Sequence, residues 1–321
     1  MRARLFMPAI GALTMLATAA SAQTYGVGSN PQGSIFYAAG AAISKVMVEK
    51  TGMQFRVSPY AGSSTYVPLI NKGELAFGLA NTAESAFAYT GTEIFKGHAN
   101  KNLRAVMLTI PILSGIGVRK DSPMKTVADL KGKKVPVGFN SGRIFHFLQG
   151  AALATAGLSD KDLQGVPTPN FIEGAKLFMS GRTDAAYFPL NAGISKQAMA
   201  TVPGGWRYLD FDGSAEGLKK MVSFTPTAMA AAIGPGPNAT GVVNNPTHLV
   251  RVDILFLTGA HVADDVVYKV VKTAYEGKAD LAKALGAFAR FDPKGMVRKH
   301  PMPYHPGAIK FFQEVGQWPP K

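Results

Sequence analysis

Apolar and polar positions follow one another along the chain in blocks that predict strands and helices in turn. Short apolar runs typical of buried strands lie at 75–80, 103–110, 116–119, 135–139, 184–188 and 249–257. Apolar residues at helical spacing lie at 36–47, 144–155 and 267–274. Glycine stops the first two of these helices. Strands and helices that alternate in this way predict an α/β protein, with a parallel or mixed sheet covered on both faces.

Two stretches of the chain repeat the same order of features. In the first, a Gly/Ser-rich loop at 28–34 opens a helix, and 71–77 ends a helix and starts a strand. In the second stretch, a loop at 138–142 opens a helix, and 179–185 ends a helix and starts a strand. The spacing between the two features is nearly the same in both stretches. We infer two similar lobes, each with a polar loop at the carboxyl end of a strand, where open α/β sheets bind ligands.

Two interruptions in the pattern predict where the chain passes between the lobes. Pro111 and Gly115 break the strand-like run at 109–117, and the stretch 233–245 is rich in Gly, Pro and Asn. We therefore expect two crossovers and no continuous sheet. The predicted parts are a leader at 1–22, a first lobe at 23–115 and 236–321, and a second lobe at 116–235.

The first residues have the features of a secretory signal peptide. Arg2 and Arg4 precede an apolar run at 5–17, and Ala20-Ser21-Ala22 presents small residues where a signal peptidase cleaves. A membrane-spanning helix needs about 20 apolar residues, so this run is too short to be an anchor. We expect cleavage before Gln23 and a periplasmic protein.

Composition and charge narrow the class of function. The formal net charge is +14, but the basic residues are spread out, and secretion argues against a nucleic-acid partner. The chain has no cysteine, which excludes disulfides and thiol chemistry. Neither a phosphate-binding loop nor a nucleophile elbow is complete, and the six histidines lack metal-ligand spacing. We expect no enzyme activity, no cofactor and no metal.

Four polar loops precede predicted helices, and together they indicate an anion site. A helix N-terminus offers unpaired N–H groups and partial positive charge, and small residues let a ligand approach the backbone. Each loop taken alone is equally well explained as a helix cap. The candidate ligand-binding residues are Gly33, Ser34, Ser63, Ser64, Thr65, Asn81, Thr82, Asn140, Ser141, Gly142 and Arg143.

Arg143 is the most distinctive of these candidates. It is predicted in the first turn of a helix, where the dipole disfavours a cation and an anionic partner would compensate. Its guanidinium can hold a carboxylate through two hydrogen bonds. The alternative is a surface arginine in water.

The chain resembles the TAXI-type extracytoplasmic solute receptors of tripartite ATP-independent periplasmic (TRAP) transporters. The glycine-rich opening loop with Phe36-Tyr37, the blocks at 62–82 and 118–135, the stretch 264–268 and the ending His305-Pro306-Gly307-Ala308 carry the resemblance. It implies a type II periplasmic-binding-protein fold, in which two α/β lobes are joined by two crossovers with a cleft between them.

The same resemblance implies a ligand and partners. The ligand would be a small anion such as glutamate or a related organic acid, and the partners would be integral membrane subunits of a TRAP transporter. Arg143 stands where the family usually has threonine, and its extra positive charge favours a more anionic ligand or a different way of holding a carboxylate. Three alternatives remain: a receptor for an ABC or tripartite tricarboxylate transporter, a periplasmic enzyme, and an anion-binding adhesin or sensor.

Overall fold

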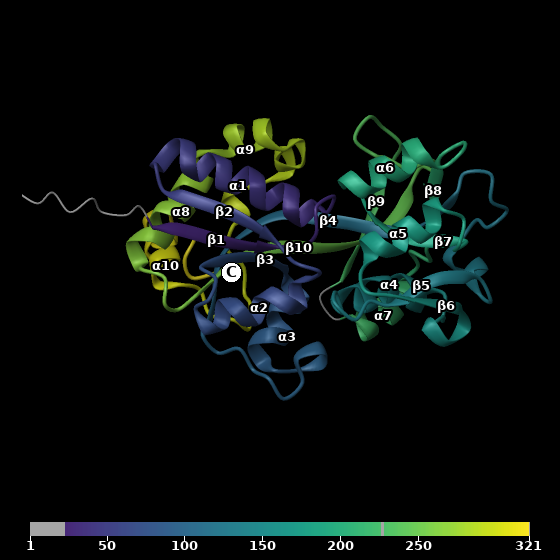
Figure 1. Cartoon of the computed structure of the whole chain (residues 1–321), viewed down its shortest axis with the longest axis horizontal. Helices are drawn as coiled ribbons and strands as arrows, with labels where there is room; N and C mark the ends of the chain where they lie inside the picture. Colours follow the sequence, from purple (N-terminus) through teal and green to yellow (C-terminus); the bar gives the residue numbers. More distant parts are fainter. Residues whose placement is uncertain (1–22, 226–227, 321) are drawn as a thin grey trace, which may run out of the picture.

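The computed structural model describes residues 23–225 and 228–320, which fold into two lobes (Figure 1). Two long strands, β4 (Leu103–Arg119) and β10 (Thr247–Gly259), run between the lobes and join them. The leader predicted at 1–22 lies outside the described residues. No helix in the described ranges is long and apolar enough to cross a membrane.

Strands and helices alternate along most of the chain, as the apolar pattern predicts. The other strands are β1 (Thr24–Ser29), β2 (Gln54–Pro59), β3 (Phe77–Asn81), β5 (Lys134–Gly138), β6 (Gln164–Thr168), β7 (Ala185–Pro189), β8 (Trp206–Tyr208) and β9 (Met229–Ile233). The helices are α1 (Ile35–Thr51), α2 (Ser63–Lys72), α3 (Thr82–Thr90), α4 (Ile144–Thr155), α5 (Phe171–Met179), α6 (Gly193–Thr201), α7 (Ala215–Phe224), α8 (Asp264–Glu276), α9 (Lys278–Ala284) and α10 (Pro306–Glu314).

The two connecting strands belong to the sheets of both lobes. The main sheet has eight strands in the order β2-β1-β3-β10-β4-β7, with β8 on β4 and β9 on β10. In the first lobe β10 pairs with β3, and in the second lobe β4 pairs with β7 and β8. The parallel pair β5-β6 forms a separate sheet. Hydrogen bonding therefore continues from one lobe into the other.

The expectation of interrupted strands and separate sheets was wrong. Pro111 lies inside β4 opposite Asp253, beside an irregularity in the pairing between Asp253 and Leu255 that accommodates a residue without an N–H. Gly115 also lies within the continuous strand. Its missing side chain leaves space for the ring of Tyr208, since a Cβ there would lie 3.0 Å from that ring. The stretch 233–245 connects β9 to β10, and the return passes through β10 itself.

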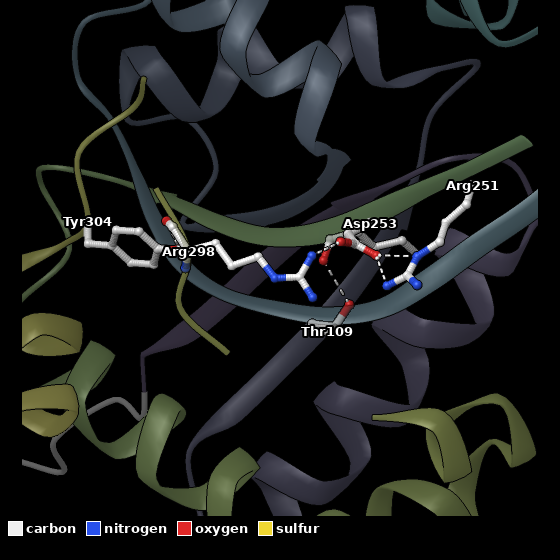
Figure 2. Close-up of polar contacts among 6 residues, drawn as sticks. Thr109, Arg251, Asp253, Arg298 and Tyr304 are labelled. Carbon is white, nitrogen blue, oxygen red and sulfur yellow. Dashed lines mark hydrogen bonds and ion pairs between the residues drawn. The ribbon is translucent and has the colours of Figure 1, made fainter. Parts of the chain in front are cut away.

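A cluster of charged side chains lies where β10 passes between the lobes. The buried carboxylate of Asp253 accepts hydrogen bonds from Arg251 Nη2 at 3.1 Å and from Arg298 Nη1 at 2.6 Å. Figure 2 shows the two guanidinium groups approaching Asp253 from opposite sides, with Thr109 of β4 close by. The backbone N–H of Arg298 donates to the Tyr304 hydroxyl. The C-terminal segment is thereby tied to the connecting strand.

Each lobe has a core of stacked aromatic rings. In the first lobe, Phe77 of β3 stacks on Phe256 of β10 with ring centroids 5.3 Å apart. In the second, Trp206 of β8 stacks on Phe188 of β7 at 4.3 Å, and its indole N–H donates to the Ser195 carbonyl at 3.0 Å. Helices α1 and α8 pack together in the first lobe, and α4 and α7 pack together in the second (Figure 1).

Candidate functional site

The first lobe presents two strand ends toward the second lobe. Strands β1 and β3 are parallel neighbours, so their carboxyl ends, Ser29 and Asn81, lie at the same edge of the sheet. Helix α1 begins just after Ser34, whose hydroxyl accepts from the Tyr37 N–H at 3.0 Å. Helix α3 begins just after Asn81, whose side chain accepts from the Glu84 N–H at 2.9 Å. Both caps are at helix starts that the sequence predicted.

The loops of the two lobes touch one another. A Cβ placed on Gly62, just before α2, would lie 2.0 Å from the carbonyl oxygen of Ser141 in the second lobe. The Ile194 N–H of α6 donates to the Gly33 carbonyl at 3.0 Å. The rings of Phe87 (α3) and Phe147 (α4) lie 5.3 Å apart. The structure is therefore a closed arrangement of the lobes.

A buried carboxylate that the sequence analysis missed lies at this contact. Glu84 is 0% exposed, and its two carboxylate oxygens accept hydrogen bonds from the hydroxyls of Ser63 and Ser64 of α2. Burial raises the pKa of Glu84 to about 7, and the two hydroxyls oppose that rise. The positive charge of Arg143 in the second lobe also lowers this pKa.

A local signal for Glu84 was present in the sequence. A glutamate three residues after a capping asparagine is the pattern of a capping box, in which its side chain would bond the N-cap backbone. Here the Glu84 side chain instead reaches α2, so the pattern marks the helix start but not the carboxylate's partners.

Several fully buried polar atoms lie near the same strand ends without a protein partner. Among the described residues, Ser29 Oγ, both amide atoms of Asn30 and Nδ2 of Asn81 make no hydrogen bond. These side chains are at most 1% exposed. An unsatisfied buried polar group costs about 1–3 kcal/mol, so these atoms are suited to hydrogen bonds with a polar ligand.

The structure places the eleven predicted residues unevenly. Ser34, Ser63, Asn81 and Gly142 are buried at the contact between the lobes, and Gly33, Ser64, Thr82 and Ser141 are half-buried. Thr65 and Asn140 are exposed, and the Thr65 hydroxyl donates back to the Gly62 carbonyl.

Arg143 is an exposed residue at the junction with α4. It occupies the N-cap position with helical backbone angles, φ −56° and ψ −22°. Within the described parts of the chain its side chain makes no hydrogen bond or ion pair. Its guanidinium is therefore free of protein acceptors and lies close enough to Glu84 to influence that group's pKa.

A small cavity also opens between the lobes, beside the start of α1. It has a volume of about 190 Å³ and is lined by residues of both lobes, including Ile35, Leu190 and Pro237. Lys196 of α6 and Arg290 contribute positive charge to its lining. The space between the lobes is thus bordered by cations on this side as well.

Comparison with known proteins gives a family and a fold. Residues 27–316 match the NMT1-like family. The alkanesulfonate-binding protein SsuA from Xanthomonas axonopodis pv. citri bound to MOPS is similar at a TM-score of 0.51 and 17% identity, over 92% of this chain and 91% of that one. A structure described as a periplasmic transporter matches at a TM-score of 0.59 and 17% identity, over 93% and 94%.

A third structure, an ancestral arginine-binding protein bound to arginine, has a TM-score of 0.50 and 16% identity, over 83% of this chain and 97% of that one. These likenesses, together with two α/β lobes joined by two strands, confirm the type II periplasmic-binding-protein fold.

Proposed function

Because the chain belongs to the NMT1-like family and has the fold of a periplasmic binding protein, we propose that it is a periplasmic receptor for a small anionic solute. It captures the solute between its lobes and delivers it to a membrane transporter, without chemical conversion. The solute is a carboxylate such as glutamate or a related organic acid. The contact between polar loops of opposite lobes carries this proposal, together with the buried Asn30 amide and Asn81 Nδ2, which have no partner among the described residues.

The loops supply the chemistry that an anion needs. The helices α1, α3 and α4 begin at the contact and offer backbone N–H groups and partial positive charge. Arg143 adds a guanidinium without a protein partner in the described ranges. The similar structures are of proteins that bind different ligands, an alkanesulfonate and arginine, so they do not define the ligand of this chain.

The transporter is proposed from the sequence resemblance alone. The blocks shared with TAXI-type receptors favour integral membrane subunits of a TRAP transporter as the partners. A receptor for an ABC or tripartite tricarboxylate transporter is the alternative. Neighbouring genes separate them, because a TRAP receptor is expected beside membrane subunits and without an ATPase gene.

The proposal also includes a leader peptide and the bounds of the two lobes. The leader at 1–22 would be removed on secretion, the first lobe would be formed by 23–115 and 236–321, and the second by 116–235. The pairing of β4 with β10 in the first lobe and with β7 in the second supports a change of lobe near residue 114.

Replacement of Arg143 tests the anion site directly. A thermal-shift screen of organic acids and amino acids identifies the acid that stabilises the folded protein most. Arg143→Ala is then expected to weaken binding of that acid by about 1.5–3 kcal/mol, the range for a hydrogen bond to a charged group. Arg143→Lys is expected to recover part of the loss, because lysine lacks the planar fork. Calorimetry measures both.

Arg182→Ala is the matched control, because Arg182 is an exposed arginine of the second lobe that lies just before β7. It should bind the acid like the wild type. Wild-type affinity in Arg143→Ala would show that Arg143 is a surface residue outside the site.

A further inference from the structure

Glu84 lies within the proposed anion site, although a carboxylate there repels an anion. Ser63, which donates to Glu84, directly follows Gly62, whose Cα lies against Ser141 of the other lobe. Asn81, which caps the Glu84 N–H, has its Nδ2 buried and without a partner in the described ranges. Three of the predicted ligand-binding residues thus contact Glu84 directly: Ser63, Ser64 and Asn81.

Within the described ranges, few other charges face the Glu84 carboxyl. From the second lobe, Arg143 is the cation that stabilises its ionised form. From α2, Tyr66 is fully buried, and burial raises its pKa well above 10, so it stays neutral near pH 7. His300 contacts the neighbouring Ser85 and the Thr82 carbonyl, and burial lowers its pKa, so it too is neutral at pH 7 and above.

An anion bound among these residues would put two negative charges in one buried place. When two carboxylates share such a site, one of them holds a proton, because their repulsion in a dry environment exceeds the cost of protonating one. Arg143 is a single cation and cannot neutralise both. The protein carboxyl that the anion would approach is Glu84, because its hydrogen-bond donors are predicted ligand contacts.

We propose that Glu84 is a carboxylic acid in the ligand-bound state, so that capture of an anionic solute takes up one proton from the solvent. The acid form keeps an acceptor oxygen for the serine hydroxyls and gains an O–H that can donate to the ligand. This inference rests on the proposed function, since it assumes an anionic ligand in the same site. The protonation state of Glu84 then determines whether the site binds an anionic ligand.

The sign of the pH dependence follows from the two states of Glu84. In the closed structure without an anion its pKa is about 7, so the carboxyl is mostly protonated below that pH and mostly ionised above it. In the bound state the anion raises this pKa further. Affinity for an anion is therefore nearly constant below about pH 6 and falls by about tenfold per pH unit above about pH 7, the slope for one proton. A cationic ligand would show the opposite trend.

Calorimetry with succinate and L-glutamate tests the proposal on the wild-type protein. Each acid is titrated at about pH 6 and about pH 8, in two non-anionic buffers with different ionisation enthalpies, so that the difference in heat counts the protons. We expect uptake approaching one proton at the higher pH and much less at the lower one. Glu84→Gln keeps the shape of the side chain and a carbonyl acceptor. It should bind each acid without proton uptake, and its affinity at the higher pH should equal its own affinity at the lower pH.

Glu49→Gln is the control, because Glu49 is an exposed glutamate on α1 that pairs with Lys45. It should behave like the wild type. Binding of either acid without proton uptake would overturn the role of Glu84 and leave the receptor proposal standing. If neither acid binds even at the lower pH, where Glu84 is mostly protonated, the proposal of a carboxylate ligand fails and this inference fails with it.

Discussion

Gly62→Ala is expected to weaken binding of the anionic ligand by roughly a hundredfold while the protein remains folded. The added Cβ would lie 2.0 Å from the carbonyl oxygen of Ser141 and 2.7 Å from the Gly142 Cα, and these backbone atoms cannot turn aside as a side chain can. The backbone at Gly62 is extended, with φ 178°, so alanine adds no strain of its own. The closed form is then disfavoured, and the fraction of molecules able to hold the ligand with both lobes falls.

The measurement is calorimetry with the acid selected by thermal shift, together with the melting temperature of the free protein. Gly236→Ala is the control, because a Cβ at Gly236 would have no atom of the described residues within 4 Å beyond its chain neighbours, and its φ is outside the left-handed region. The control should bind like the wild type. Equal affinities for Gly62→Ala and the wild type would show that the contact between Gly62 and Ser141 has no part in binding.

Trp206→Ala is expected to lower the free energy of unfolding by about 3–5 kcal/mol, the cost of truncating a large buried aromatic side chain. Trp206 is 1% exposed, and its ring stacks on Phe188. Gly117 and Gly241 lie so close to the indole that a Cβ on either would come within 2.7 Å of it. The indole therefore anchors β8 and the loop that leads into β10, and its loss leaves a cavity under both.

Urea denaturation followed by circular dichroism measures this change. Trp318→Ala is the comparison, because Trp318 is the other tryptophan and is only partly buried near the C-terminus. Replacement of Trp318 should lower the free energy of unfolding by clearly less than replacement of Trp206. Equal costs at the two positions would contradict the view that Trp206 organises the second lobe.

Features encoded locally could be predicted from the sequence. Ser34 and Asn81 were recognised as polar residues before apolar helices, and the structure shows both as caps. The short apolar run at 75–80 predicted a buried strand, and the structure has one at Phe77–Asn81. Such signals depend on residues a few positions apart, and a single sequence contains them in full.

Features that depend on distant segments could not be predicted in the same way. Pro111 and Gly115 break a strand in the usual statistics, yet here pairing with β10 and packing under Tyr208 keep β4 continuous. Glu84 matches a helix-capping pattern, and only the approach of α2 gives its carboxylate the hydroxyls of Ser63 and Ser64. Tertiary contacts outweighed local preference at each of these places.

Small-angle scattering with and without ligand tests the central claim, that a solute is held between two lobes that close on it. In the free protein the lobes are expected to be more open than in the structure, because the buried Asn30 amide and Asn81 Nδ2 have no partner among the described residues. A saturating concentration of the acid selected by thermal shift should reduce the radius of gyration to that of the closed form, since a ligand contacting both lobes favours it. An unchanged radius of gyration at saturation would contradict capture between the lobes.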